Sequence, residues 1–495
     1  MTSVRRGLGA WSAAAAAVLL RLTPPFELNH DCGWYLFVAT RWLAGDRLYT
    51  DLVEVNPPLV VYLSTLPALV ALRTGWPLGA VFHTCVLGLI AVSLWLCRRV
   101  LCDRECDRID RATLWVAAVV VLVVWPGGDF GQREHCMVVT LLPWLVAAAA
   151  RTATAEARVM PAGLALGIGL FAAVGVSLKP YFLLAPLLVR LGEVWAVRRW
   201  RFPLEDFGLL LGVSGYAVHL LCVPFRDGLL ATIALVRQDY SAYSTPLGVL
   251  FAQSWTLRAA GLGVGLGVSL LWSSQLRRPL RVLALAWSGL FLAALWQGKG
   301  WSYHLLPAEL VGLLGVALLL ARLCAMPRLR LLGPVFAVLV AGLSGVRIAQ
   351  HALQRDPGTG ALRRAPPFTG LDAETMVLQR LAPGDALLLL DTDMHVFFGW
   401  MAERRLRWAS RYACLWRLPA ALRDPRRLPE FASEIAADLR HHRPRLVLVR
   451  RGTPAYAPDG FELANFVRSQ AVLRDALADY RVVRTGTRFL VLSRP

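Results

Sequence analysis

Lysine is almost missing from this chain, which has two lysines and 51 arginines among its 495 residues. Charge as a whole is also scarce: charged residues make up 17% of the sequence, whereas a soluble domain carries about a quarter. Hydrophobic residues account for 56%, and the mean hydropathy is +0.51. Because so little charge cannot cover a water-soluble surface of this size, the composition excludes an ordinary soluble enzyme and indicates a membrane protein.

Several familiar motifs are absent as well. The sequence has no P-loop, no Gly-x-Gly-x-x-Gly between a strand and a helix, and no internal repeat. These absences argue against a nucleotide-binding enzyme and against a transporter built from repeats. The nine cysteines show no disulfide framework, and Cys102 and Cys106 have no histidine nearby to complete a zinc site. The net charge of +20 does not imply a nucleic-acid partner, because no nucleic-acid motif accompanies it.

Apolar runs that suit membrane spans, which need about 17–25 residues each, recur along most of the first 350 residues. We therefore expect a polytopic α-helical membrane protein of about eleven spans, with residues 1–349 as its membrane domain. The expected spans are residues 8–23, 77–97, 113–126, 136–150, 159–178, 181–197, 205–222, 257–274, 281–296, 304–321 and 331–349.

The distribution of basic residues sets the orientation. With the N-terminus inside, the cytoplasmic loops hold eighteen basic residues and the outer loops eight, as the positive-inside rule requires. The apolar run 57–72 would reverse every later loop if it crossed, so we expect an interfacial or re-entrant helix within the first outer loop, 24–76. The first span lacks a small-residue cleavage site and is expected to be a signal anchor. The arginine-rich composition is typical of a high-GC bacterium, so the expected location is the bacterial cytoplasmic (inner) membrane.

The chain after residue 349 has a different character. Residues 385–391, 445–450, 480–483 and 488–492 read as strands, and 371–381, 428–441 and 460–478 read as helices. Residues 350–495 are therefore expected to form a small extracytoplasmic α/β domain. It holds 23 arginines against 15 acidic residues. This excess suits anionic lipid headgroups or a phosphorylated substrate, and an ordinary solvated surface is an equally good explanation.

Acidic residues gather in the first outer loop. Asp31, Asp51 and Glu54 stand beside an apolar span, where carboxylates are costly unless they bind or react with something. Simpler explanations stay open: Asp31 is also suited to cap a helix over 33–43, and Asp51 or Glu54 to be a solvated loop acid. Pro57-Pro58 suits the start of the interfacial helix.

Both lysines lie at outer ends of expected spans, Lys179 beside Pro180 and Lys299 between two glycines. The chain uses arginine at nearly every other basic position, so these two lysines stand out. A lysine ammonium is a compact charge that is suited to binding a phosphate. Interfacial anchoring is the open alternative. The other outer-loop groups have local explanations too: Arg133-Glu134 as an ion pair and His304 as an interfacial histidine. In the C-terminal domain, Asp391, Asp393 and His395 suit either a metal site or an ordinary strand end.

The unusual residues form a pattern of five short motifs. The motifs are Asp31-x-x-x-Tyr35, Gly45-x-x-x-Tyr49-x-Asp51-x-x-Glu54-x-Asn56-Pro57-Pro58-Leu59, Gln132-Arg133-Glu134, Leu178-Lys179-Pro180 and Lys299-x-x-x-Tyr303-His304. The pattern resembles the C-type (GT-C) glycosyltransferase superfamily, in particular the bacterial branch related to protein mannosyltransferases and to the aminoarabinose transferases that modify lipid A. The resemblance covers roughly residues 8–350. It implies a membrane enzyme that takes a sugar from a polyprenyl-phosphate (or pyrophosphate) carrier and gives it to a hydroxyl of a lipid, glycan or protein on the outer face.

The resemblance also implies roles. Asp31 would be the catalytic base, with Glu54 positioning the acceptor or sharing a divalent cation (Mg or Mn) with it; the metal is optional, and Cys32 stands where a second acid would strengthen such a site. Open alternatives are a transporter or flippase, a polymerase or ligase of lipid-linked sugars, and a non-catalytic scaffold. The expected residues are Asp31, Glu54 and Asp51 for catalysis, Lys179, Lys299, Arg133, Tyr303 and His304 for the donor phosphate, and Tyr35, Tyr49, Asn56 and Glu134 for positioning.

Overall fold

The computed structural model describes residues 14–24, 26, 28–101, 109–151, 160–198, 201–272, 276–329, 335, 377–395 and 397–494. Apart from residue 335, the expected span 331–349 falls outside these residues, and so does most of the expected helix 371–381. The chain divides into two compact units. Unit 1 comprises Met1–Glu27, Phe82–Cys222 and Thr245–Leu353, and unit 2 comprises Leu28–Val81, Val223–Ser244 and Gln354–Pro495.

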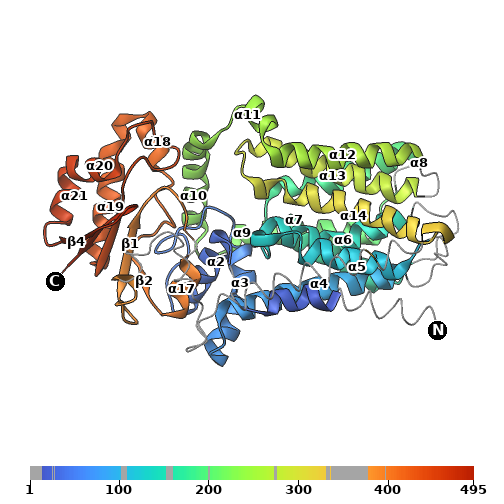
Figure 1. The fold of residues 1–495 in the computed structure, drawn as a ribbon, viewed down its shortest axis with the longest axis horizontal. Helices are drawn as coiled ribbons and strands as arrows, with labels where there is room; N and C mark the ends of the chain where they lie inside the picture. The colour runs from blue at the N-terminus through green and yellow to red at the C-terminus, as the bar shows by residue number, and fades with distance from the viewer. Residues whose placement is uncertain are drawn as a thin grey trace. The chain divides into compact units, whose positions relative to one another are not determined.

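Unit 1 is a set of apolar helices (Figure 1). Six helices of the described chain are long and apolar enough to cross a membrane, and the shorter α5 and α7 are also apolar. The multi-pass helical fold is thereby confirmed. Helix ends follow local signals: the Asp110 side chain caps α5, and Pro161 precedes α7. The helices are α4 (Leu78–Leu101, whose first turn belongs to unit 2), α5 (Arg111–Val123), α6 (Arg133–Arg151), α7 (Ala162–Val176), α8 (Leu184–Val197), α9 (Leu204–Cys222), α11 (Leu247–Ala252), α12 (Ser254–Trp272), α13 (Arg277–Gln297) and α14 (Leu306–Cys324).

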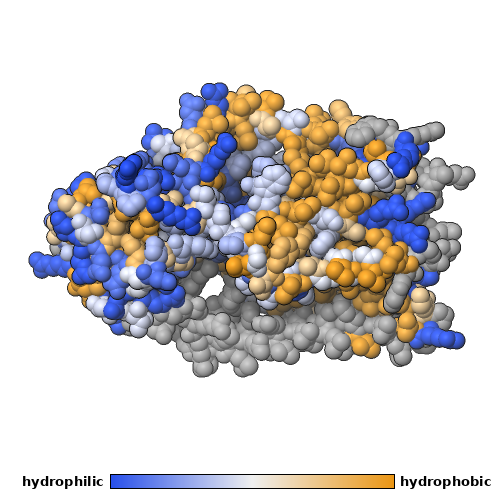
Figure 2. All heavy atoms as spheres, turned by 90° about the horizontal axis from the view of Figure 1, so that it is seen from above, coloured by the Kyte–Doolittle hydropathy of each residue, from blue (hydrophilic) through white to orange (hydrophobic). Residues whose placement is uncertain are grey.

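Small residues let these helices pack closely. A Cβ atom on Gly169 of α7 would overlap the backbone of α9, and one on Gly208 of α9 would overlap the backbone of α7. Such glycine contacts suit a bilayer, where close packing rather than the hydrophobic effect joins helices. The outward side chains are apolar: Leu271 is 78% exposed and Val264 67%, and Figure 2 shows apolar residues spread over this helical surface.

Unit 2 combines the first loop with the C-terminal domain. The loop contributes α2 (His30–Leu43) and α3 (Leu59–Thr74), and α3 begins after Pro58 where a helix over residues 57–72 was expected. Residues 223–244 add α10 (Arg226–Asp239) and the 3-10 turn η3 (Tyr240–Tyr243). The surface of the C-terminal domain is mostly hydrophilic in Figure 2.

The C-terminal domain has a mixed five-stranded sheet in the order β2-β1-β3-β5-β4. Strand β1 is parallel to β2 and β3, and β5 is antiparallel to β3 and β4. The four predicted strands are present, and the missed β2 has only two residues. The predicted helix 460–478 is broken in two at Gln470. The elements are β1 (Ala386–Leu390), α17 (Phe398–Glu403), β2 (Arg407–Trp408), α18 (Leu418–Arg423), α19 (Leu428–His442), β3 (Leu446–Arg450), α20 (Leu463–Ser469), α21 (Ala471–Ala476), β4 (Arg481–Thr485) and β5 (Phe489–Ser493).

Helix α17 of the C-terminal domain packs directly on α2, the helix that carries Asp31. The rings of Trp34 and Phe398 lie 4.7 Å apart. Gly33 faces the backbone of Gly399 so closely that an added Cβ would lie 3.3 Å from its nitrogen. The C-terminal domain therefore supports the acidic loop, a role that the sequence pattern did not indicate.

Candidate active site

Asp31 lies in the first turn of α2 and is 8% exposed. The helix begins at His30, earlier than expected, and its cap is Asn29, whose side-chain oxygen accepts the Asp31 N–H at 2.8 Å. The alternative that Asp31 caps the helix is therefore wrong. The His30 Nε2 atom lies 3.5 Å from the Asp31 carboxylate. Asp31 lies in the first turn of the helix, where the helix dipole favours a negatively charged carboxylate.

Glu54 is almost completely buried, with 1% exposure. One carboxylate oxygen accepts the Trp34 indole N–H at 2.6 Å, and the other accepts the backbone and side-chain N–H groups of Asn56. Trp34 stands one helical turn after Asp31 on α2. Glu54 therefore ties the end of the acidic loop to the helix that carries Asp31.

We expect Glu54→Gln to destabilise the protein by about 1–3 kcal/mol, because an amide cannot accept all three N–H bonds and would turn its own donors toward them. Thermal unfolding in detergent, followed by tryptophan fluorescence, measures this change. The exposed Asp227 on α10 offers a matched control, Asp227→Asn, which should leave the unfolding midpoint unchanged. An unaltered midpoint in Glu54→Gln would contradict the assigned role.

The remaining candidate residues of the loop make contacts within the connection between α2 and α3. Asp51 pairs with Arg47 at 2.9 Å, and this hydrogen bond lowers the pKa of the Asp51 carboxyl although the side chain is 39% exposed. These contacts favour the alternative of a solvated loop acid. Tyr49 has a left-handed backbone (φ 60°) and donates from its hydroxyl to the Asn56 carbonyl at 2.6 Å. Tyr35 is buried within α2.

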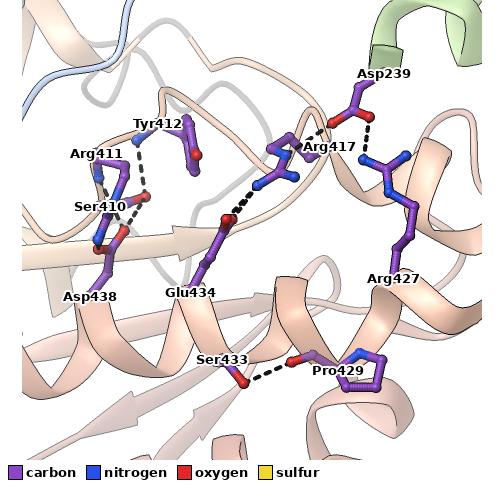
Figure 3. A network of polar contacts seen from close by, with 10 residues as sticks. All are labelled: Asp239, Ser410, Arg411, Tyr412, Arg417, Arg427, Pro429, Ser433, Glu434 and Asp438. Carbon is purple, nitrogen blue, oxygen red and sulfur yellow. Dashed lines mark hydrogen bonds and ion pairs between the residues drawn. The ribbon is translucent and has the colours of Figure 1, made fainter. Parts of the chain in front are cut away.

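Two further ion-pair networks of unit 2, centred on Asp438 and Asp239, lie in the segments that contact this loop and α10, and Figure 3 shows both networks. The Val53 N–H donates to the Arg411 carbonyl at 2.7 Å, and the Arg411 side chain pairs with buried Asp438. At the end of α10, fully buried Asp239 accepts from Arg417 at 2.9 Å and from Arg427 at 2.5 Å. Buried charges are stable only when paired in this way, so these networks fix α10 and the acidic loop to the C-terminal domain.

The cations expected to bind phosphate gather in unit 1. Lys179 stands between α7 and α8, is 7% exposed, and pairs with fully buried Glu134. Its ammonium also lies 3.3 Å from the Gln297 side-chain oxygen. Glu134 therefore has an ion-pair partner 45 residues away in the chain, which the sequence did not indicate. Glu134 accordingly lies with the cations of unit 1, and Tyr35, Tyr49 and Asn56 lie in unit 2.

Three cations act on His304, which is 5% exposed in the turn before α14. Burial lowers the pKa of His304 well below its usual value, and the charges of Lys179, Arg133 and Lys299 lower it further. Tyr303 places its ring 4.6 Å from that of His304 and 5.7 Å from the Lys179 ammonium. The histidine is therefore neutral at pH 7, and three cations lie within electrostatic reach of it, of which Lys179 is paired with Glu134.

Some contacts of the site were not foreseen from the sequence. Gln297 ends α13 with an isolated polar group beside the Lys299 loop, which was the available signal. The Thr245 N–H and hydroxyl bind the carbonyls of Gly298 and Lys299 at 2.7 and 3.1 Å and fix that loop. Buried Glu309 accepts from Arg258 at 2.7 Å and from Trp125 at 3.1 Å, and no local pattern indicates these contacts.

In the part of the chain that the structure describes, no group of three or more His, Cys, Asp or Glu side chains is arranged to hold a metal ion. Asp391 instead pairs with His395 at 2.9 Å and with Arg450 at 3.1 Å. This pairing favours a structural strand end over the metal site among Asp391, Asp393 and His395.

The fold resembles a solved structure along nearly its whole length. The crystal structure of ArnT from Cupriavidus metallidurans bound to undecaprenyl phosphate matches with a TM-score of 0.57 and 14% sequence identity, covering 98% of this chain and 97% of that one. No family model matches the sequence, and no curated protein matches it. ArnT is a lipid A aminoarabinose transferase of the GT-C superfamily. The expected GT-C-like fold is therefore confirmed.

Proposed function

We propose that this chain, with its GT-C-like fold, transfers a sugar from a polyprenyl-phosphate-linked donor to an acceptor hydroxyl at the outer face of the bacterial cytoplasmic membrane. The proposal is supported by the fold, shared with a protein that binds undecaprenyl phosphate. It rests above all on one feature of unit 1: the charges of Lys179, Arg133 and Lys299 act together on a buried histidine.

Such a cluster suits a phosphate leaving group. When the bond from the anomeric carbon to the carrier phosphate breaks, the phosphate takes the electron pair and its negative charge grows. Fixed cations in a buried site stabilise that charge strongly, because little water competes with them. Neutral His304 and Tyr303 add hydrogen-bonding groups without adding an anion. The two lysines that the sequence retains would therefore bind the donor phosphate.

The acceptor half of the reaction needs a base. Asp31 would take the proton of the acceptor hydroxyl while its oxygen attacks the anomeric carbon, the role that fits a carboxylate at the rim of a buried loop. Glu54 would take no part in the proton transfer and would only hold the loop against the helix that carries Asp31. A divalent cation (Mg or Mn) shared by Asp31 and Glu54 stays optional in this proposal, since the proposed steps do not need it.

The proposal is tested by reconstituting the full chain in proteoliposomes with a polyprenyl-phosphate sugar. A transferase releases polyprenyl phosphate as a new glycosidic bond forms, and both products can be measured by mass spectrometry. A flippase would move the intact donor across the bilayer instead. Transport of unchanged donor without released carrier phosphate would refute the transferase.

The pH dependence offers a second check. Burial lowers the pKa of Lys299 to about 8, so its ammonium is charged at pH 7 and loses its charge as the pH rises through about 8. We expect kcat/KM for the donor, which reports groups of the free enzyme, to fall above pH 8. In Lys299→Arg the charge persists, so the fall should move to higher pH. The same alkaline limb in wild type and Lys299→Arg would exclude Lys299 as the titrating group.

A further inference from the structure

A second polar cluster lies in unit 2, at the carboxyl end of strand β1. Asp391 follows the strand and binds the His395 Nε2 atom at 2.9 Å and the Arg450 guanidinium at 3.1 Å. Arg450 ends the neighbouring parallel strand β3. The carboxyl ends of adjacent parallel strands are the place where α/β sheets bind ligands.

Two tyrosines join this cluster from other segments. The Thr392 hydroxyl donates to the Ala455 carbonyl at 2.8 Å and so fixes the loop that carries Tyr456. The Tyr456 backbone is left-handed (φ 62°), and its ring is 47% exposed and lies 4.7 Å from the buried ring of Tyr243. The strained backbone of Tyr456 holds the ring half exposed, so that it presents an apolar face and a polar hydroxyl.

The cluster contains polar groups without partners. The Asp393 carboxylate accepts no hydrogen bond from the residues that the structure describes, and burial together with Asp391 raises its pKa. Because His395 uses Nε2 to bind Asp391, its Nδ1 atom also stays without a protein partner in this part of the chain. The indole N–H of Trp416, whose carbonyl accepts the Tyr243 hydroxyl, is buried and unpaired in the described structure. Asp393 and His395 are only partly buried, so their polar atoms are accessible to a ligand.

The cluster is close to Asp31. Burial raises the pKa of the Cys414 thiol, and the carboxylates of Asp391, Asp393 and Asp31 each raise it further. All three carboxylates thus lie within electrostatic reach of one side chain. The same effect excludes a nucleophilic role for Cys414, because the thiolate is the reactive form and this setting disfavours it.

We propose that Asp393, His395 and Tyr456 form the binding site for a sugar ring of the acceptor, which is therefore a saccharide. Sugar hydroxyls would donate to the Asp393 carboxylate and to His395 Nδ1, and the ring would pack on Tyr456. Asp31, on the nearby helix α2, would take the proton of the reacting hydroxyl. This inference rests on the proposed function, and it distinguishes a saccharide acceptor from a protein side chain or a simple lipid alcohol.

The test measures binding of methyl pyranosides of mannose, glucose and galactose to the full chain in lipid nanodiscs by saturation-transfer NMR. We expect the wild type to bind at least one of them. Asp393→Asn, which is nearly isosteric, and Tyr456→Ala should each weaken that binding about tenfold, as expected for the loss of one hydrogen-bonding or stacking contact. Asp459→Asn, in the same loop as Tyr456, is the matched control and should bind as the wild type does.

Failure has a clear form. No binding of any pyranoside by the wild type, or equal binding by wild type, Asp393→Asn and Tyr456→Ala, would overturn the proposal. Slow hydrolysis of the polyprenyl-phosphate sugar, measured in parallel, depends on the donor half alone. Hydrolysis that persists while pyranosides fail to bind would leave the transferase standing and remove the saccharide site. Pyranoside binding in a protein that never cleaves the donor would support the site and refute the proposed transferase.

Discussion

Asp31→Asn is expected to lower sugar transfer by about 10²–10⁴-fold, the contribution of a positioned general base. Asparagine has nearly the same shape and keeps the helix start, whose cap is Asn29, but it cannot take the acceptor proton. Binding of the polyprenyl-phosphate donor should be unchanged, because the cations that would hold it belong to unit 1. Radiolabelled transfer in proteoliposomes and donor binding by fluorescence quenching measure the two effects separately.

The matched control for this variant is Asp46→Asn in the same loop. Asp46 pairs with Arg41 at 2.7 Å, and its side chain is 26% exposed. Since this pair has no part in the proposed chemistry, its loss should change transfer less than threefold, the effect of one weak ion pair near the surface. Full activity in Asp31→Asn would remove Asp31 as the base. Equal losses in both variants would mean that the loop responds to any lost charge.

Lys179→Met is expected to reduce transfer by about 10²–10³-fold, in line with the loss of one preorganised charge-stabilising group. It should also destabilise the protein by about 3–5 kcal/mol, because it leaves Glu134 charged, fully buried and without its partner. The double variant Lys179→Met/Glu134→Gln removes both charges. We expect it to regain most of the stability and none of the activity, which separates the structural role of the pair from its role toward phosphate.

Arg258→Met is the control for this experiment. It also strips the ion-pair partner from a buried carboxylate of unit 1, since the Glu309 side chain is only 3% exposed and pairs with Arg258. It removes no cation of the cluster around His304. Unfolding midpoints and transfer rates of all variants, measured in one lipid, decide the question: activity that returns in Lys179→Met/Glu134→Gln would show that Lys179 serves stability alone.

Much of the fold could be read from local sequence. Spans, the helix after Pro58 and the strands after residue 384 follow from hydropathy, proline and short apolar runs, all of which act within a few residues of the chain. Two details differ from the local pattern. The cap of α2 is Asn29 and not Asp31, and Glu134 has a partner, Lys179, that lies 45 residues away in the chain.

The sequence predicts which residues belong to the candidate site, but it does not predict which of them contact one another. Asp31 and the two lysines stood out because a carboxylate beside a span and a lysine in an arginine-rich chain are both unusual. Trp34 and Arg411 gave no such signal, since each owes its role to a partner far away along the chain. The same holds for Asp393 and Tyr456, 63 residues apart at the ends of neighbouring strands and brought close by the Thr392–Ala455 hydrogen bond.

By itself, the sequence determined that this is a multi-pass membrane protein with an acidic first loop, two retained lysines and an α/β tail, because hydropathy and composition are properties of short segments. Only the tertiary structure decided that Glu54 is buried against Trp34, that Lys179 is matched by Glu134, and that the tail belongs with the first loop. The contact between Leu78 and Glu403, 325 residues apart, shows the reason. Packing selects partners by shape and by the need to pair buried charges. Neither requirement produces a recognisable pattern in a short segment of sequence.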